Sequence, residues 1–396
     1  MTLNTSNIAG NNNNSFVGLT AGGDITIIIG KDLPAEVKQQ KEMFNVKLKE
    51  LAETLVLIDE KITTAQKPET FIPPENNQTY ETTAWRKLTQ ALRQEVCVLF
   101  IGPEISVNSQ GKSLHHEFYM QLAQENSEIE YLENEGYFSP ESDDIVLPDA
   151  IDFYSFDFPK KNIVGRKILE QLAQVPFSLI ISICPDDTMH KVFDDYNLSH
   201  EFLVHDGTKH EVEPMTPEKP MIYNILGNVS SINGKYIFTH ENFYNYLNKV
   251  IIPAEIKKKI KDATHYLFIG FDFNKWYNRL LLFILDFEQK RGGDRRMTIG
   301  TKNVKEDIEK FIAKQFKITF VDHDYSQFIE WFTYKVKEEN MLRNLNQGFL
   351  QNSVLRLKSL SAKISAEDNL DELVKIDRQV VELAKSISKF KQNISG

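Results

Sequence analysis

Side chains that could do chemistry gather where short apolar runs end. The run VCVLFIG ends at Gly102 and leads to Ser106, and the run FSLIISIC leads to Asp186. A glycine at a strand-to-helix turn lets backbone N–H groups approach a phosphate at the helix N-terminus. The structural alternative is a tight turn in which Ser106 caps the helix. Asp186 could equally cap a helix, hold a ribose hydroxyl or polarise a water.

Two later runs end in the same way. NILGNVS carries Gly227 and Asn228, and YLFIGFDFNKW carries Gly270 and Asp272. Ligands of parallel α/β sheets bind beyond the carboxyl ends of the strands, so the positions after each run are the ones expected in a site. The predicted nucleotide-binding residues are Gly102, Ser106, Gly227, Asn228, Gly270 and Asp272.

The nine histidines show no familiar metal-binding pattern. His115 and His116 are adjacent, so on a helix they point about 100° apart and form a poor metal pair. His190 follows Asp186 closely and could act as a base, although an isolated histidine more often serves packing or a cap. Three others recur every five residues and indicate a solvated loop or an edge hairpin: His200, His205 and His210. We expect no metal ion.

The elements that must position these residues alternate along the middle of the chain. Six apolar runs separated by helical stretches predict strands at 96–102, 177–184, 221–226, 266–271, 296–300 and 317–322. Their near-continuous hydrophobicity is typical of parallel strands buried on both faces. The sequence therefore predicts an α/β domain over residues 81–335, with a doubly wound, Rossmann-type parallel sheet.

Helices are expected at both ends of the chain. Apolar residues spaced four and three apart predict a heptad helix over 34–62, and a similar seam runs from 373 to 394 behind a helix at roughly 338–364. These stripes could pack on each other or on another chain. Residues 1–31 are rich in Asn and Gly and predict a tail or short hairpin. The expected divisions are 1–31, a heptad helix and Pro-rich linker over 32–80, the α/β domain over 81–335, and a helical C-terminal region over 336–396.

Composition excludes several classes of protein. The 396 residues carry a net charge of −10, from 46 basic and 56 acidic side chains, which argues against a nucleic-acid-coating protein. Two cysteines, Cys97 and Cys184, cannot build a disulfide framework or a four-cysteine zinc site. The polar N-terminus has no secretory signal pattern, and no run reaches the ~18 apolar residues of a membrane span. We expect a soluble, cytoplasmic protein.

The ordered motifs resemble the sirtuin-like family, and specifically its prokaryotic anti-phage defence branch. VLFIGPEIS is similar to the family's Gly-Ala-Gly-x-Ser turn, IISICPDD to its Ile-Thr-Thr-Asn-x-Asp strand, and NILGNVS to its Leu-His-Gly segment. FTHENFYNYL and YLFIGFDFNKW match the Thr-x-x-x-Tyr and Phe-Ile-Gly segments that follow. The resemblance covers about residues 85–335 and implies a sirtuin-like domain that binds NAD or a related nucleotide.

The departures from the family pattern fall where its chemistry is done. Cys184 stands where NAD-hydrolysing members have Asn, and Leu226 stands where they have His. Pro103 and Glu104 replace small residues of the nucleotide turn, and the carboxylate of Glu104 is electrostatically unfavourable beside a pyrophosphate. Leu226 cannot transfer a proton, so that position supplies no general base. The resemblance therefore implies a catalytically degenerate scaffold or nucleotide-sensing subunit of a defence complex, assembled with itself or a partner through the terminal helices and residues 1–31.

The resemblance leaves two enzymatic alternatives. In the first, the protein is an NAD⁺ glycohydrolase in which Asp186 stabilises the ribose cation, Asn228 orients a ribose hydroxyl and His190 replaces the missing base. In the second, it is a protein deacylase. That alternative is weaker, because it needs the absent His and is usually accompanied by a four-cysteine zinc module.

Overall fold

The computed structural model describes residues 33–65, 82–139, 143–229, 236–285, 295–299, 304–321 and 325–393. These residues form two compact units. The helical unit contains the described residues up to position 72, residues 195–197 and the residues from 344 onward. The α/β unit contains residues 73–194 and 198–343. The Asn/Gly-rich segment 1–31 and most of the expected linker lie outside the described residues.

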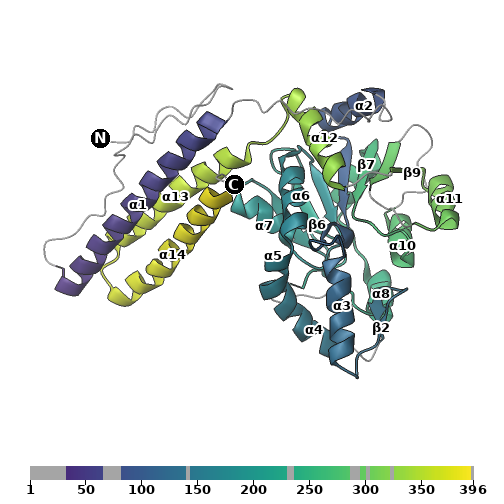
Figure 1. The fold of residues 1–396 in the computed structure, drawn as a ribbon, viewed down its shortest axis with the longest axis horizontal. Coiled ribbons are helices and arrows are strands. Elements are labelled where there is room, and N and C mark those ends of the chain that lie inside the picture. Colours follow the sequence, from purple (N-terminus) through teal and green to yellow (C-terminus); the bar gives the residue numbers. More distant parts are fainter. Residues whose placement is uncertain are drawn as a thin grey trace. The chain divides into compact units, whose positions relative to one another are not determined.

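The α/β unit is built on a sheet of seven parallel strands (Figure 1). The strands are β1 (Cys97–Ile101), β4 (Leu179–Ser182), β5 (Glu201–Val204), β6 (Met221–Asn224), β7 (His265–Ile269), β8 (Arg295–Ile299) and β9 (Ile318–Val321). Every position of β1, β4 and β6 is buried. All six predicted strands are present, which confirms the α/β class and the parallel sheet.

The order of the strands identifies the point where a ligand would bind. Across the sheet the order is β5-β6-β4-β1-β7-β8-β9. Without the edge strand β5, the remaining six follow the 3-2-1-4-5-6 order of doubly wound folds, in which the chain reverses direction across the sheet between β1 and β7. The carboxyl ends of these two central strands therefore flank the crevice that such folds use for ligands.

Strand β5 corrects one expectation. The sequence around His200, His205 and His210 predicts a solvated loop or an edge hairpin, whereas residues 201–204 form a parallel edge strand beside β6. Its four side chains are half-buried. An edge strand with one covered face carries a weaker apolar signal than the central strands, so the run EFLV was too short and too mixed to be recognised.

Eleven helices of the described α/β unit flank the sheet. They are α2 (Thr82–Arg93), α3 (Leu114–Glu125), α4 (Asp143–Asp152), α5 (Phe158–Lys161), α6 (Ile163–Gln174), α7 (Thr188–Asp195), α8 (His240–Lys249), α9 (Ala254–Asp262), α10 (Trp276–Ile284), α11 (Glu306–Gln315) and α12 (Tyr325–Glu338). A short hairpin of β2 (Tyr131–Leu132) and β3 (Tyr137–Phe138) follows α3. Ser113 caps α3 and Thr239 caps α8, each by accepting a hydrogen bond from a backbone N–H of the first turn.

A buried arginine fastens the segment after α12 to the α/β core. The guanidinium of Arg343 donates to the carbonyls of Ala173, Val175, Phe177 and Pro217, at 2.6–3.1 Å. Burial lowers the pKa of Arg343 to about 10, so the group stays charged at neutral pH. One guanidinium thus bonds four carbonyls together, of which that of Val175 also accepts from the N–H of Phe177 at 2.8 Å.

The helical unit consists of three long helices in the described chain: α1 (Ala35–Ala65), α13 (Leu345–Ala366) and α14 (Leu370–Asn393). They lie side by side and pack on one another (Figure 1). The heptad positions are buried in this packing, including Phe44 and Leu48 of α1 and Val380 and Leu383 of α14. The expected helix at 338–364 begins later, at Leu345. Of the two packings that the sequence left open, the structure shows the one in which the terminal seams cover each other.

One ion pair lies within the helical unit at a buried position. Lys41 is 1% exposed, and its ammonium contacts the carboxylate of Asp368 at 2.8 Å and the carbonyl of Ser365 at 3.2 Å. Among the described helices, none is long and apolar enough to cross a membrane.

Candidate functional site

A cavity of about 440 Å³ opens beyond the carboxyl ends of β1, β4 and β7. Pro103 and Glu104 reach it from the turn after β1, Pro185 from the turn after β4, and Asp272 from the turn after β7. The remaining walls come mainly from α3, the β2–β3 hairpin and the start of α10. The volume is that of a small-molecule site, and the place is the crevice predicted by the strand order.

Two of the predicted glycines join the turns at this crevice. A Cβ on Gly102 would lie 2.2 Å from the carbonyl oxygen of Gly270, and Gly270 itself has a φ of +73°. The backbone N–H of Gly102 donates to Ile269 at 2.8 Å, and that of Glu104 donates to Gly270 at 3.1 Å. Both glycines therefore permit a close backbone crossing, and neither is among the residues that line the cavity.

The other predicted nucleotide-binding residues divide into two groups. Asp272 lines the cavity, as expected of a residue after a central strand. Ser106 and Asn228 are each 1% exposed and stand outside the cavity lining, as does Gly227, whose φ is +93°. The structure thus brings one of the six into the wall of the cavity and places the others behind it.

The two positions that depart from the family pattern are buried. Cys184 and Leu226 are 5% and 4% exposed, and neither lines the cavity. Burial raises the pKa of the Cys184 thiol well above its ordinary value, so the thiol is neutral at neutral pH. Neither side chain offers the cavity a proton acceptor.

Glu104 lines the cavity and has a strongly shifted pKa. Desolvation, followed by the nearby carboxylate of Asp272, raises the pKa of Glu104 to about 7, against smaller opposing effects of Lys275 and of a hydrogen bond with Ser113. The side chain therefore populates both protonation states near neutrality, which is the property of an effective general acid or base. Sequence reasoning treated Glu104 only as an obstacle to a phosphate and missed this property.

A second pair of groups has one member in the cavity wall: His115 lines the cavity, whereas Asp186, a predicted catalytic residue, is not among the lining residues. Nε2 of His115 and Oδ2 of Asp186 face each other at 3.9 Å, and both atoms are buried without a hydrogen-bond partner in the structure. His115 Nδ1 shares a hydrogen bond of 2.7 Å with the hydroxyl of Tyr154. Burial lowers the pKa of His115 to about 3 and raises the pKa of Asp186. The gap of 3.9 Å is too long for a direct hydrogen bond, and both atoms are shielded from solvent.

Tyrosine rings form much of the remaining wall. The cavity is lined by Tyr119, Tyr131, Tyr137, Tyr236 and Tyr277. Burial raises the pKa of each of these phenols, so they are neutral at physiological pH. Two lysines, Lys275 and Lys305, also line the cavity. The composition suits a ligand that combines an aromatic or cationic ring with polar and anionic parts.

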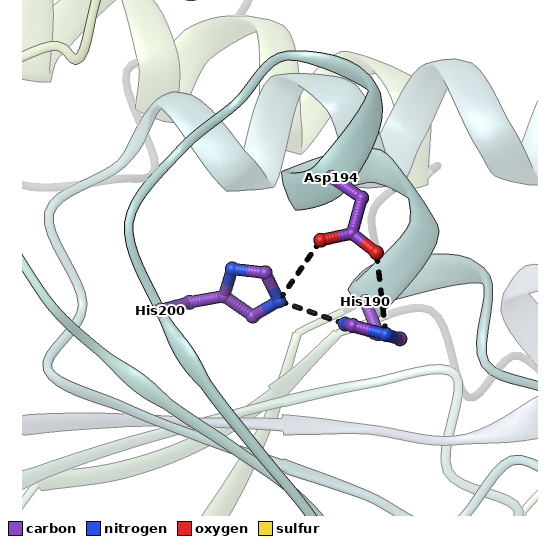
Figure 2. Close-up of side chains that lie close together, drawn as sticks. All are labelled: His190, Asp194 and His200. Atoms are coloured by element: carbon purple, nitrogen blue, oxygen red, sulfur yellow. Dashed lines mark hydrogen bonds and ion pairs between the residues drawn. The ribbon is translucent and has the colours of Figure 1, made fainter. Parts of the chain in front are cut away.

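The remaining predicted catalytic residue, His190, lies outside the cavity lining. Its ring is turned toward His200 and Asp194 (Figure 2). His115, which sequence reasoning set aside because it adjoins His116, lines the cavity instead. The position of α3, directly after the first strand of a doubly wound sheet, is the sequence feature that could have identified His115 as a cavity residue.

Comparison with known proteins adds no family assignment. No protein-family model matches the chain, and no curated protein matches it with significant similarity. The functional conclusions therefore depend on the geometry of the cavity and on the motif resemblance.

Proposed function

We propose that the α/β unit binds a pyridine nucleotide such as NAD⁺ in the cavity beyond β1 and β7, and acts as a nucleotide-sensing subunit. The observation that carries the proposal is the cavity itself, which lies at the crevice of a doubly wound sheet and combines tyrosine rings with carboxyl groups. A role in a prokaryotic anti-phage defence complex depends on the motif resemblance alone.

The charges of the cavity favour an oxidised pyridine nucleotide over other nucleotides. The nicotinamide ring of NAD⁺ carries a positive charge, which tyrosine faces and the carboxyl groups of Glu104 and Asp272 would attract. Carboxylates are also the usual acceptors for ribose hydroxyls in doubly wound folds. The phosphates would need cationic partners, and the lining offers the two lysines, Lys275 and Lys305.

The unpartnered atoms of His115 and Asp186 support the same fit. A buried donor or acceptor left without a partner costs about 1–3 kcal/mol, so a side-chain shift that admits a polar ligand atom from the cavity to His115 and Asp186 would be favoured. A ribose hydroxyl or a carboxamide can both donate and accept, which would satisfy the pair. A purely apolar ligand would leave it unsatisfied.

Calorimetry tests the binding directly. NAD⁺, NADH and ATP are titrated separately into the purified chain, and we expect saturable binding of NAD⁺, with NADH weaker because its ring is neutral. Asp272→Asn and Glu104→Gln should weaken NAD⁺ binding, whereas Glu125→Gln, on the exposed face of α3, should leave it unchanged. Absence of saturable NAD⁺ binding at millimolar concentration would remove the proposal.

Hydrolysis of NAD⁺ is a second candidate, and the pKa of Glu104 near 7 favours it. In that reaction the bond from the ribose carbon to nicotinamide breaks with its electron pair leaving on nicotinamide, while water attacks the same carbon. Ionised Glu104 would take the proton of the water, and Asp186 would stabilise the positive charge on the ribose. Nicotinamide release, measured by chromatography, should then disappear in Asp186→Ala. Binding without release would leave the sensing role.

The proposal also includes assembly of the chain with another subunit through its helical unit. Although the heptad seams of the helical unit cover each other, several large apolar side chains remain exposed on its helices, including Val46, Leu57, Leu355 and Val374. We propose that this unit and residues 1–31 contact a partner subunit or a second copy of the chain. Light scattering after gel filtration measures the oligomer. Removal of residues 1–31 should weaken capture of the partner subunit if the segment docks.

A further inference from the structure

We propose that His190, Asp194 and His200 bind one divalent transition-metal ion, with Zn²⁺ as the expected species (Figure 2). The three residues lie apart from the nucleotide cavity, so the inference does not depend on the proposed function. It also departs from the sequence-based expectation that the protein binds no metal.

The local fold explains why these side chains meet. His190 and Asp194 are four residues apart on α7, and side chains at this spacing share one face of a helix. His200 comes from the residue immediately before β5. The N–H of Leu198 donates to the carbonyl of Phe193 at 2.8 Å, which closes the return from the helix and brings His200 back beside that face.

The distances are those of a site that needs little rearrangement. Each residue offers one ligand atom, and the three atoms lie within 4.8 Å of one another. His190 Nδ1 is 2.7 Å from His200 Nε2, His190 Nε2 is 3.3 Å from Asp194 Oδ2, and His200 Nε2 is 3.8 Å from Asp194 Oδ1. Ligands about 2.0–2.1 Å from a tetrahedral Zn²⁺ are separated by about 3.3 Å. An ion bound through one nitrogen of His190 would therefore take the place of the contact between the two rings.

The proton positions prepare His200 to act as a ligand. Its Nδ1 lies 2.8 Å from the carbonyl oxygen of Leu198. A carbonyl can only accept, so Nδ1 carries the proton and Nε2 presents its lone pair to His190 and Asp194. Metal-binding histidines usually donate their other N–H to a carbonyl or carboxylate in this way, which fixes both the tautomer and the ring.

Packing holds the second ring in place. His190 is stacked on Phe202 of β5, with ring centres 4.1 Å apart and an interplanar angle of 5°. Asp187 is paired with Lys191 at 2.7 Å, so this lysine does not neutralise the carboxylate of Asp194.

The donor set selects the class of metal. Two imidazoles and one carboxylate suit Zn²⁺, Co²⁺ and related ions, whereas Mg²⁺ and Ca²⁺ prefer oxygen ligands throughout. Asp194 is 59% exposed, so the fourth position of a tetrahedral ion is open to water. The alternative is a hydrogen-bonded chain of two rings and a carboxylate that holds no ion.

The test uses full-length protein prepared without a histidine tag and dialysed against chelator. CoCl₂ is titrated and followed by visible absorption, which is intense for tetrahedral Co²⁺ and weak for octahedral Co²⁺, and ZnCl₂ is then added as competitor. We expect one equivalent of tetrahedral Co²⁺ that Zn²⁺ displaces. His200→Gln and Asp194→Asn should each lower the affinity more than about 100-fold, since removal of a ligand exceeds the usual effect of an outer partner.

A matched control lies ten residues beyond His200. His210 contacts Asp206 at 2.9 Å with the same four-residue spacing, but without a second histidine. His210→Gln should leave Co²⁺ binding unchanged. The exposed position of Asp194 keeps Asp194→Asn informative if His200→Gln fails to fold, as far-ultraviolet circular dichroism would show. No saturable binding, or equal binding by wild type and both ligand variants, would establish the hydrogen-bonded chain instead.

Discussion

The substitution Glu104→Gln isolates the carboxyl group that dominates the electrostatics of the cavity. The ordinary pKa of the group is 4.5, and in the folded chain it is raised to about 7. Between these two values the unfolded chain ionises Glu104 while the folded chain still holds the proton. The folded state therefore loses stability as the pH rises from about 4.5 to 7, and the loss stays constant above that range.

The size of the effect follows from the same two values. A pKa difference of this size corresponds to about 3 kcal/mol at most, and partial contact of the side chain with solvent in the cavity reduces the expected value to about 2 kcal/mol. Glutamine keeps the shape of the side chain and cannot ionise. We therefore expect Glu104→Gln to match the wild type at pH 4.5–5 and to exceed its free energy of unfolding by about 2 kcal/mol at pH 8.

Urea unfolding followed by tryptophan fluorescence measures this difference in free energy for the α/β unit. All three tryptophans of the chain, at positions 85, 276 and 331, belong to the α/β unit, so their signal does not report the helical unit. Glu128→Gln, an exposed carboxyl after α3, serves as the control and should show no such pH-dependent gain. A variant that tracks the wild type at both pH values would refute the assignment of a raised pKa to Glu104.

Three further substitutions test the packing that positions the site. Gly102→Ala should destabilise the α/β unit by about 3 kcal/mol or prevent folding, because a Cβ there meets the Gly270 carbonyl oxygen at 2.2 Å. Thermal melting measures this loss of stability. Arg343→Lys should cost about 3 kcal/mol in urea unfolding, since an ammonium cannot satisfy four carbonyls at once; a loss below about 1 kcal/mol would contradict this. Lys41→Met should change the free energy of unfolding by less than about 1 kcal/mol, because its partner Asp368 stays hydrated. Lys41→Ala leaves a void and should lower that free energy by about 2 kcal/mol. Unfolding followed by circular dichroism measures both changes.

The strands could be predicted from sequence because each central strand is apolar on both faces. Runs such as VCVLFIG and YLFIGF have no polar face, and only a parallel sheet covered by helices buries such runs completely. Strand β5 was missed because EFLV is half-buried and short. Prediction of this edge strand requires its pairing with β6, and the local hydrophobic periodicity carries no information about that pairing.

The site was only partly predictable for a related reason. Asp272 was found because it follows a central strand, and the carboxyl ends of such strands meet at one edge. His115 and Tyr119 come from α3, and Tyr131 and Tyr137 come from the β2–β3 hairpin, which reaches the cavity through tertiary packing. The cluster of His190 and Asp194 did leave a local signal, a helical spacing of four, but its third member His200 arrives through a turn that the sequence does not specify.

Apolar or neutral residues at one strand end do not by themselves remove acid–base chemistry from the cavity. Leu226 and Cys184 are buried outside the cavity lining and contribute no charge at neutral pH. Glu104 and His115 nevertheless bring ionisable groups to the cavity wall from other elements. Binding and turnover therefore have to be separated by experiment. If Glu104→Gln abolishes nicotinamide release even at saturating NAD⁺, the carboxyl group of Glu104 acts as the base. If the wild type binds NAD⁺ and releases nothing, the carboxyl groups serve recognition alone, and the nucleotide is a signal.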